Sequence, residues 1–173
     1  MERRKMKTKI LIIFIINLLF WANGHNPVFA MEHIQKNGLF SMNVPGGWHW
    51  MENPQEVVIT YPDRKTIAID IQLMLSRHLT QADIKKTLKE ANDKMIKKGI
   101  EAHHGTLIDD KEIKLDGVYA TRLDFETVPP NPIHVTYISF FNKDYGFSIT
   151  YGSEDDKMHS VMDGVVATFK FLP

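Results

Sequence analysis

The stretch from Thr66 to Leu75 constrains the fold more than any other part of the chain. Large aliphatic side chains occupy every second position, and polar residues such as Asp70 and Gln72 fall between them. The alternating aliphatic residues are Ile67, Ile69, Ile71, Leu73 and Leu75. Successive side chains of a strand point to opposite faces of a sheet, so this pattern predicts a strand with one apolar face. A slip of one residue would invert all of these side chains, which fixes the register of the strand.

Several other segments predict strands joined by tight turns. In 38–50, Phe40, Met42 and Val44 alternate with polar residues before Pro45, which cannot donate to a strand ladder. The run 56–61 is β-branched and precedes a turn at 62–65. Asp116-Gly117 predicts a two-residue hairpin turn. The remaining predicted strands are 104–115, 118–126, 133–141, 147–151 and 168–172.

Two segments have the apolar spacing of amphipathic helices. The first spans 80–98, with a capping box at Thr80 and Asp83 and a predicted apolar stripe. That stripe comprises Ile84, Leu88, Ala91 and Met95. The second follows Ser153 as predicted cap, with a stripe of Met158, Val161, Met162 and Val165, and Gly164 predicted as a point of close packing. Strands and helices in this order predict an α+β fold with a mainly antiparallel sheet.

The first 30 residues have the features of a secretory signal peptide. Five basic residues precede an apolar run at 10–21, and Val28-Phe29-Ala30 fits a cleavage site. The run is shorter than the roughly 20 residues that a membrane-spanning helix needs. We therefore expect cleavage after Ala30, with Gly24 as a second possible site and an uncleaved anchor as the alternative. Export would leave 31–173 as a single extracytoplasmic domain, periplasmic or secreted.

Charge and cysteine content exclude some classes of partner and linkage. Residues 1–30 hold five of the 21 basic and one of the 21 acidic residues, so the remainder has a net charge of −4. This balance argues against non-specific binding to nucleic acid and gives no reason to expect stable membrane insertion after cleavage. The chain has no cysteine, so it forms no disulfide and carries no lipid at a mature N-terminal cysteine.

Several of these segments together resemble the PsbP-like superfamily. They are GLFSMNVPGGWHW, EVVITYPDRKTIAIDIQL, LDGVYATRLDFE, YGFSITYGS and the terminal TFKF. That superfamily includes the PsbP extrinsic proteins of photosystems, DcrB-type bacterial envelope proteins and a Ran-binding nuclear import factor. The resemblance implies an antiparallel sheet sandwiched between helices, an α-β-α sandwich. It also implies a binding or assembly role without catalysis. The absence of cysteine departs from the lipoprotein members.

Local motifs for chemistry are absent from the sequence. There is no nucleophile elbow, HExxH motif, phosphate loop or dinucleotide-binding turn, and no cofactor is expected. His103 and His104 are weak candidates for a metal site, because adjacent strand residues face opposite sides unless the backbone turns. We expect His49, His103, His104, His134 and His159 to lie apart.

Two groups of residues are candidates for contact with a partner protein. We expect Trp48 to lie in the core, whereas Trp50 fits either the core or an exposed aromatic surface. Pro129, Pro130 and Pro132 predict a stiff loop of the kind that often carries recognition, although a simple connection between strands explains it as well. The sequence thus predicts an exported, non-catalytic binding or assembly module whose partner is a protein of the cell envelope. The alternatives are a metal-binding protein and a small hydrolase with an unrecognised site.

Overall fold

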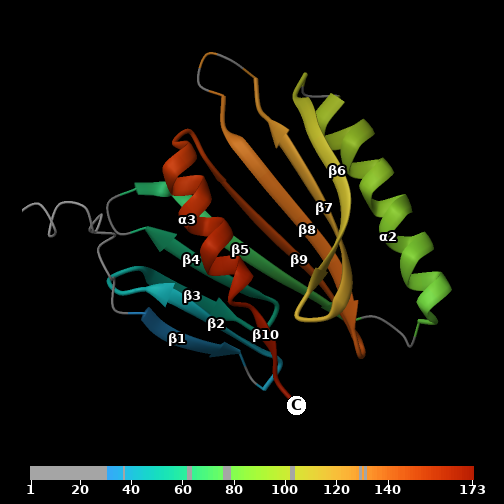
Figure 1. The fold of residues 1–173 in the computed structure, drawn as a ribbon, viewed down its shortest axis with the longest axis horizontal. Coiled ribbons are helices and arrows are strands. Elements are labelled where there is room, and N and C mark those ends of the chain that lie inside the picture. The colour runs from blue at the N-terminus through green and yellow to red at the C-terminus, as the bar shows by residue number, and fades with distance from the viewer. Residues whose placement is uncertain are drawn as a thin grey trace, which may run out of the picture. The chain divides into compact units, whose positions relative to one another are not determined.

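Short turns join consecutive strands into antiparallel pairs (Figure 1). The computed structural model describes residues 31–36, 38–61, 64–75, 79–101, 104–128, 130 and 132–173. Five strands come first: β1 (Met31–Lys36), β2 (Phe40–Pro45), β3 (His49–Asn53), β4 (Glu56–Tyr61) and β5 (Arg64–Leu75). Helix α2 (Gln81–Met95) and the π-helical turn η1 (Ile96–Ile100) follow. The remaining elements are β6 (Thr106–Leu115), β7 (Val118–Glu126), β8 (His134–Asn142), β9 (Tyr145–Ser153), α3 (Asp156–Ala167) and β10 (Lys170–Phe171).

The strands form two sheets. Seven of them form one sheet in the order β3-β4-β5-β9-β8-β7-β6, and each pair of neighbours in it is antiparallel. The other sheet has the order β1-β2-β10 and is also antiparallel. In the predicted hairpin, Asp116 and Gly117 have φ values of 47° and 82°, as a turn that matches strand twist requires. The predicted α+β class with a mainly antiparallel sheet is confirmed.

Helices cover both faces of the seven-stranded sheet (Figure 1). Helix α2 packs on β7 and β8 from one side, and α3 packs on β9 from the other. Helix α3 also contacts β2, so the three-stranded sheet shares its layer. The sandwich predicted from the resemblance is therefore present, with a small second sheet beside one of its helices.

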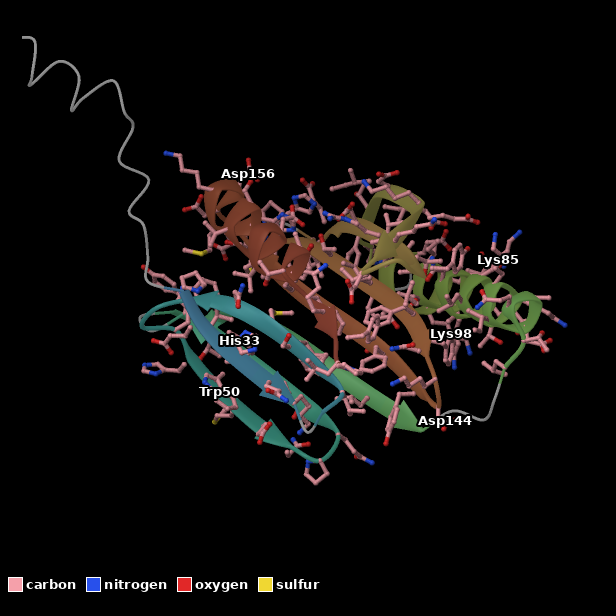
Figure 2. All side chains as sticks on the ribbon, turned by 60° about the horizontal axis from the view of Figure 1, so that its bottom comes forward. His33, Trp50, Lys85, Lys98, Asp144 and Asp156 are labelled. Carbon is pink, nitrogen blue, oxygen red and sulfur yellow. The ribbon has the colours of Figure 1, made fainter. Side chains whose placement is uncertain are left out.

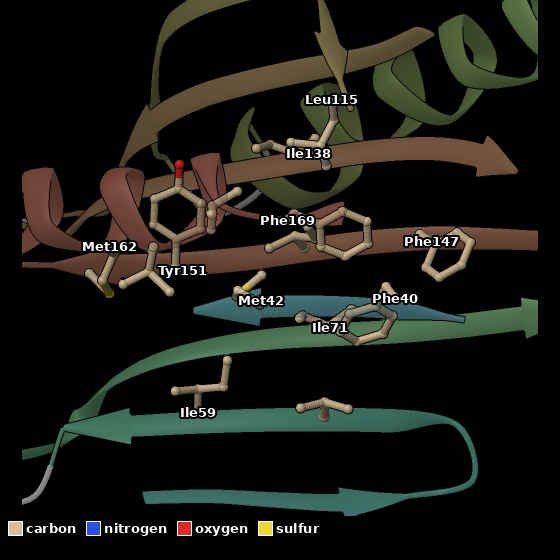
Figure 3. Packing of buried hydrophobic residues seen from close by; sticks show 14 of the residues in the cluster. Phe40, Met42, Ile59, Ile71, Leu115, Ile138, Phe147, Tyr151, Met162 and Phe169 are labelled. Carbon is tan, nitrogen blue, oxygen red and sulfur yellow. The ribbon is translucent and has the colours of Figure 1, made fainter. Parts of the chain in front are cut away.

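The main core lies between the large sheet and the layer made by α3 and the three-stranded sheet (Figure 3). Its centre is a group of phenylalanine rings in contact. Phe40 stacks on Phe169 with ring centroids 4.8 Å apart, and Phe140 stacks on Phe147 at 5.0 Å. The predicted inner face of β5 is confirmed at Ile71, which is fully buried. Because the packed side chains come from both ends of the chain, burial of apolar area holds the two layers together.

Residues 168–172 bond to the hairpin formed by β1 and β2. Strand β10 pairs with β2, and the Leu172 N–H donates to the Leu39 carbonyl at 3.0 Å. The Asn43 N–H donates to the Thr168 hydroxyl at 2.8 Å. These bonds confirm the predicted short last strand and connect residues that lie more than 120 positions apart in sequence.

The buried residues of helix α2 differ from the predicted apolar stripe. The Thr80 cap is as expected, since its hydroxyl accepts from the Asp83 N–H. However, Ala91 is exposed and Asn92 is buried in its place. The Asn92 amide donates to Asp110 at 3.2 Å and accepts from Thr121 at 3.1 Å, which satisfies it on this face. The helix also continues past the predicted end as η1.

Helix α3 begins and packs differently from the prediction. Its N-cap is Asp155, whose carboxylate accepts from the Lys157 N–H, while Ser153 ends β9. Val161 is exposed, and His159 and Val166 are buried instead. The helix is thus rotated about its axis relative to the predicted apolar stripe, because His159 finds polar partners underneath.

Gly164 is not the close-packing point that the sequence predicts. It is exposed, and a Cβ built on it would meet no atom within 4 Å. Because glycine in a helix interior costs about 1 kcal/mol relative to alanine, we expect Gly164→Ala to stabilise the protein by about that amount. Urea denaturation measures the change, and a destabilised variant would show that a neighbouring group approaches this position.

Candidate functional site

A group of polar side chains lies on the α3 face of the large sheet. We call it the Arg122 cluster. It consists of Arg122 and Asp124 on β7, Thr136 on β8, Tyr151 on β9, and His159 and Asp163 on α3. Arg122 and Asp124 share a face because they are two positions apart on one strand. Strand register places Thr136 opposite Asp124, and helical spacing places Asp163 one turn after His159.

The guanidinium of Arg122 connects the strands to the helix. Its Nε lies 2.9 and 2.8 Å from the two carboxylate oxygens of Asp124. Its Nη1 donates to Asp163 at 2.9 Å, and its Nη2 donates to the Thr136 hydroxyl at 3.2 Å. The Tyr151 hydroxyl donates to the same Asp163 oxygen. Arg122 therefore bonds to carboxylates on both sides of the layer boundary, and Lys111 of β6 lies 3.6 Å from Asp124 as a second cation.

This arrangement shifts the protonation equilibria of the cluster. Burial raises the pKa of Asp124, but hydrogen bonds from Arg122 and Thr136 outweigh it, so the pKa lies below its ordinary value. Burial also opposes the charge on Arg122, yet its two carboxylate partners raise its pKa further above the usual range. Burial, followed by the bond to Asp163, raises the pKa of Tyr151. At neutral pH the cluster thus holds a charged arginine, a charged Asp124 and a neutral tyrosine.

The residue types of a catalytic triad occur here as Thr136, His159 and Asp163, but the hydrogen bonds among them run in the opposite direction. The Thr136 hydroxyl gives its single proton to Asp124 Oδ1 at 2.6 Å, so His159 Nε2, 3.1 Å away, acts as the donor to Thr136. His159 Nδ1 then carries the lone pair and lies 3.7 Å from Asp163. In a triad, Nε2 takes the hydroxyl proton and Nδ1 donates to the carboxylate. Thr136 is also fully buried, so the geometry is that of a structural network.

His134 and His159 do not lie apart, so that expectation is wrong for this pair. Their rings stack with centroids 3.9 Å apart and an interplanar angle of 7°. His134 Nε2 is buried without a hydrogen-bond partner in the part of the chain that the structure describes. His134 is the first residue of β8 and pairs with Glu126 of β7, and its ring meets His159 of α3. Sequence spacing could not show this, because α3 brings His159 from 25 positions away.

The buried histidine gives the protein a pH-dependent stability. Burial, followed by the charge of His134, lowers the pKa of His159; Asp163 and Asp124 oppose this shift, and Arg122 adds to it. The unfolded chain therefore binds a proton below about pH 6.5 that the folded chain does not take up until lower pH. We expect the free energy of unfolding to fall as pH drops below 6.5, by at most about 1.4 kcal/mol per pH unit from this group. Urea denaturation between pH 7.5 and pH 5 measures the slope.

The matched control for this prediction is His159→Gln, whose amide can still donate to Thr136 but does not titrate. A variant with the same slope as the wild type would show that other groups cause the pH dependence.

Trp48 lies in the core, whereas Trp50 lies on the surface. Trp48 is buried at 6 % exposure and packs edge-on against Tyr61, with ring centroids 5.6 Å apart, which confirms its predicted place in the core. Trp50 is 41 % exposed on β3 (Figure 2). Its side chain borders a narrow crevice against β1 that is closed at one end by Lys36 and Glu52, whose charged groups are 3.6 Å apart.

The proline loop is anchored at its base. The Thr127 N–H donates to the Ile133 carbonyl at 3.0 Å, and the Ile133 N–H donates to the Thr127 hydroxyl at 2.8 Å. Pro130 and Pro132 are exposed, and Pro129 lies outside the described residues.

Of the two candidate metal ligands, the structure describes only His104. His104 is exposed in a turn with φ of 59°, and His103 lies outside the described residues. Among residues that the structure describes, no three histidine, aspartate or glutamate side chains are grouped to hold a metal ion. None of the described helices is long and apolar enough to span a bilayer.

A groove of about 440 Å³ lies on the other side of the sheet. Its floor is Val118, Tyr119 and Phe141, and the first turn of α2 forms one wall. The remaining lining comes from Leu79 and from the two hairpin turns at Gly117 and at Asn142-Lys143. On β7, Tyr119 faces this groove, whereas Arg122 and Asp124 point to the opposite face of the sheet. The sheet itself therefore separates the groove from the Arg122 cluster.

Sequence analysis missed the Arg122 cluster. The available signal was the pattern Ala120, Arg122, Asp124, in which two opposite charges occupy the strand face that begins with a small apolar residue. A charged pair at i and i+2 on a predicted inner face indicates a buried ion pair. The partners from α3 could not be inferred, because their side chains belong to a helix whose orientation the apolar stripe predicted incorrectly.

Comparisons with known proteins identify the fold. No protein-family model matches the sequence, and no curated protein matches it either. Among solved structures, the solution structure of cyanobacterial PsbP (CyanoP) from Synechocystis superposes with a TM-score of 0.65 at 15 % identity, covering 86 % of this chain and 96 % of that one. A protein from Bacteroides thetaiotaomicron gives 0.60 at 14 % identity, covering 82 % of this chain but only 48 % of its own length. LpqN of Mycobacterium tuberculosis, involved in cell envelope biogenesis, gives 0.50 at 15 % identity, covering 86 % and 88 %.

These likenesses span more than four fifths of this chain. At such low identity they concern the fold alone. The domain formed by residues 31–173 has a PsbP-like fold.

Proposed function

We propose that this protein is an exported, non-catalytic binding or assembly module of the cell envelope, whose partner is an envelope protein. The observation that carries the proposal is the closure of the Arg122 cluster. Its arginine, carboxylates and hydroxyls bond to one another, and its one hydroxyl near a histidine is fully buried. A catalytic site needs convergent groups that a substrate can reach, whereas Asp124, Thr136 and His159 of this cluster are buried.

Two further observations support the envelope assignment. The N-terminal 30 residues have the pattern of a signal peptide. Among the structures with a similar fold is LpqN, which is involved in cell envelope biogenesis. The likeness supports only the fold, so the location of this protein needs its own test.

That test is the mass of the mature protein. We expect the protein recovered from outside the cytoplasm to begin at Met31, since Val28-Phe29-Ala30 fits the cleavage specificity. A chain of full length that stays in the membrane fraction would contradict export with cleavage.

The proposed contact surface consists of Trp50 and the proline loop. Trp50 is an exposed aromatic side chain, and aromatic residues are enriched where proteins bind one another. Pro130 and Pro132, with Pro129 between strands β7 and β8, belong to a loop whose base is fixed by two hydrogen bonds at Thr127. Proline has a fixed φ, so Pro130 and Pro132 lose little backbone entropy when they bind.

Photo-crosslinking tests this surface in the living cell. A benzophenone amino acid replaces Trp50 or Pro132, and the matched control replaces Lys86, an exposed residue of α2. We expect a discrete adduct with a different protein from at least one of the first two positions and none from Lys86. Adducts of equal yield from all three positions, or from none, would contradict a specific contact there.

A further inference from the structure

The two edges of the seven-stranded sheet are built differently. At one edge, β6 carries five charged side chains between Asp109 and Lys114, and a bulge interrupts its ladder beside Ile108. Both features are known to prevent a sheet from pairing with another chain. The exposed Leu107 and Ile108 of this strand lie at the bulge, where regular pairing is broken.

The opposite edge, β3, lacks this protection. Its register with β4 is uninterrupted from His49 to Asn53, and it contains no lysine or proline. All five of its residues are exposed, and Met51 is 69 % exposed. Within the described residues, no strand pairs with the outer side of β3. Figure 2 shows Trp50 of this strand at the periphery of the ribbon.

The sequence of β3 is complementary to itself in an antiparallel pair. With a two-fold axis at Met51, the two Met51 side chains meet, Trp50 faces Glu52 of the second copy, and His49 faces Asn53. Each strand is then paired along its full length, and no like charges face each other. An axis at Glu52 would oppose two carboxylates, and any axis other than Met51 would leave residues of the strand unpaired.

We propose that two copies of this protein pair through β3, in an antiparallel ladder centred on Met51. The pairing joins two seven-stranded sheets into one continuous sheet. The contact is short, so the dimer is weak and its population rises with protein concentration. This inference rests on the backbone edge of β3, the strand that also carries Trp50 of the proposed contact surface.

The absence of native cysteine makes a direct test possible. Residues directly opposite in an antiparallel pair have Cα atoms roughly 4.5–5.5 Å apart, which lies within the roughly 4.4–6.8 Å of a disulfide. Only the residue on the axis meets its own copy. We therefore expect Met51→Cys to form a disulfide-linked dimer under mild oxidation at least about tenfold faster than Trp50→Cys or Glu52→Cys, since neither of those positions meets its own copy.

A cysteine on the far side of the molecule, Lys86→Cys on α2, gives the rate of random collision. If Met51→Cys crosslinks no faster than this control, the dimer is overturned. If Trp50→Cys or Glu52→Cys crosslinks fastest, the proposed register is overturned.

Sedimentation of the unmodified protein gives a second, independent readout. We expect reversible dimerisation as the concentration rises, and Met51→Lys to raise the dissociation constant by about fivefold or more, because two lysines would face each other across the axis. The control is Val161→Lys, which places a lysine at another exposed apolar position, on α3. A wild-type protein that sediments as a monomer at every concentration would overturn the proposal.

Discussion

Replacing Trp48 by alanine is expected to lower the free energy of unfolding by about 3–5 kcal/mol, the usual cost of removing a large buried aromatic side chain. Trp48 is 6 % exposed and belongs to the main core, where it packs edge-on against Tyr61. The loss combines the lost transfer free energy of the indole with the cavity that it leaves. Urea denaturation followed by circular dichroism measures the change.

Trp50→Ala is the matched control, because it removes the same side chain two positions away from a 41 % exposed site. We expect it to change the stability by less than about 1 kcal/mol, as surface substitutions usually do. Equal losses in the two variants would mean that Trp50 also supports the core, and its proposed role in partner contact would lose its basis.

Removing the Arg122 guanidinium is expected to cause the second large loss in the free energy of unfolding. Arg122→Met leaves Asp124, whose side chain is 7 % exposed, with only the half-exposed Lys111, 3.6 Å away, as a cationic partner. Breaking a buried ion pair by deleting one member costs about 3 kcal/mol or more, because the remaining charge is uncompensated. We expect a loss of this size at neutral pH, where Asp124 is ionised because its pKa is lowered in the folded protein.

The double variant Arg122→Met/Asp124→Leu separates this cause from lost packing. It removes both charges and keeps apolar volume on the sheet, so we expect it to recover at least about half of the stability that the single variant loses. The comparison is made in the same urea titration. A double variant less stable than Arg122→Met would show that the aliphatic stem of Arg122, and not its charge, carries the stabilisation.

The loss in Arg122→Met should also shrink on acidification. The lowered pKa of Asp124 contributes stability that is present above the ordinary carboxyl pKa, near 4, and is lost as pH falls through the lower folded value. In the variant the part of that contribution that comes from Arg122 is missing at every pH. Its stability deficit should therefore become smaller between pH 5 and pH 3.

The strands were predictable because their signal is local. Two strand-like runs joined by a turn such as Asp116-Gly117 specify a hairpin from the local sequence alone. The same locality explains the confirmed core position of Trp48, which follows a glycine turn directly after β2.

The helix faces were less predictable because polar residues are buried beneath both helices. Asn92 replaces the expected Ala91 on α2 because Thr121 and Asp110 are available to bond it. His159 replaces the expected Val161 on α3 for the same reason, since Thr136 and His134 lie beneath it. A stripe drawn from apolar residues alone cannot identify such positions, because the compensating partners come from distant strands.

The pairing of β10 with β2 has a consequence for how the domain folds during synthesis. Strand β2 receives its last partner, and Phe40 its stacked ring, only from residues 169–171. A growing chain that has reached residue 160 holds every strand of the large sheet but still lacks Phe169. Contacts that span this much sequence form late and slow the approach to the native state. A nascent domain that still lacks residues 169–171 therefore lacks its closing contact.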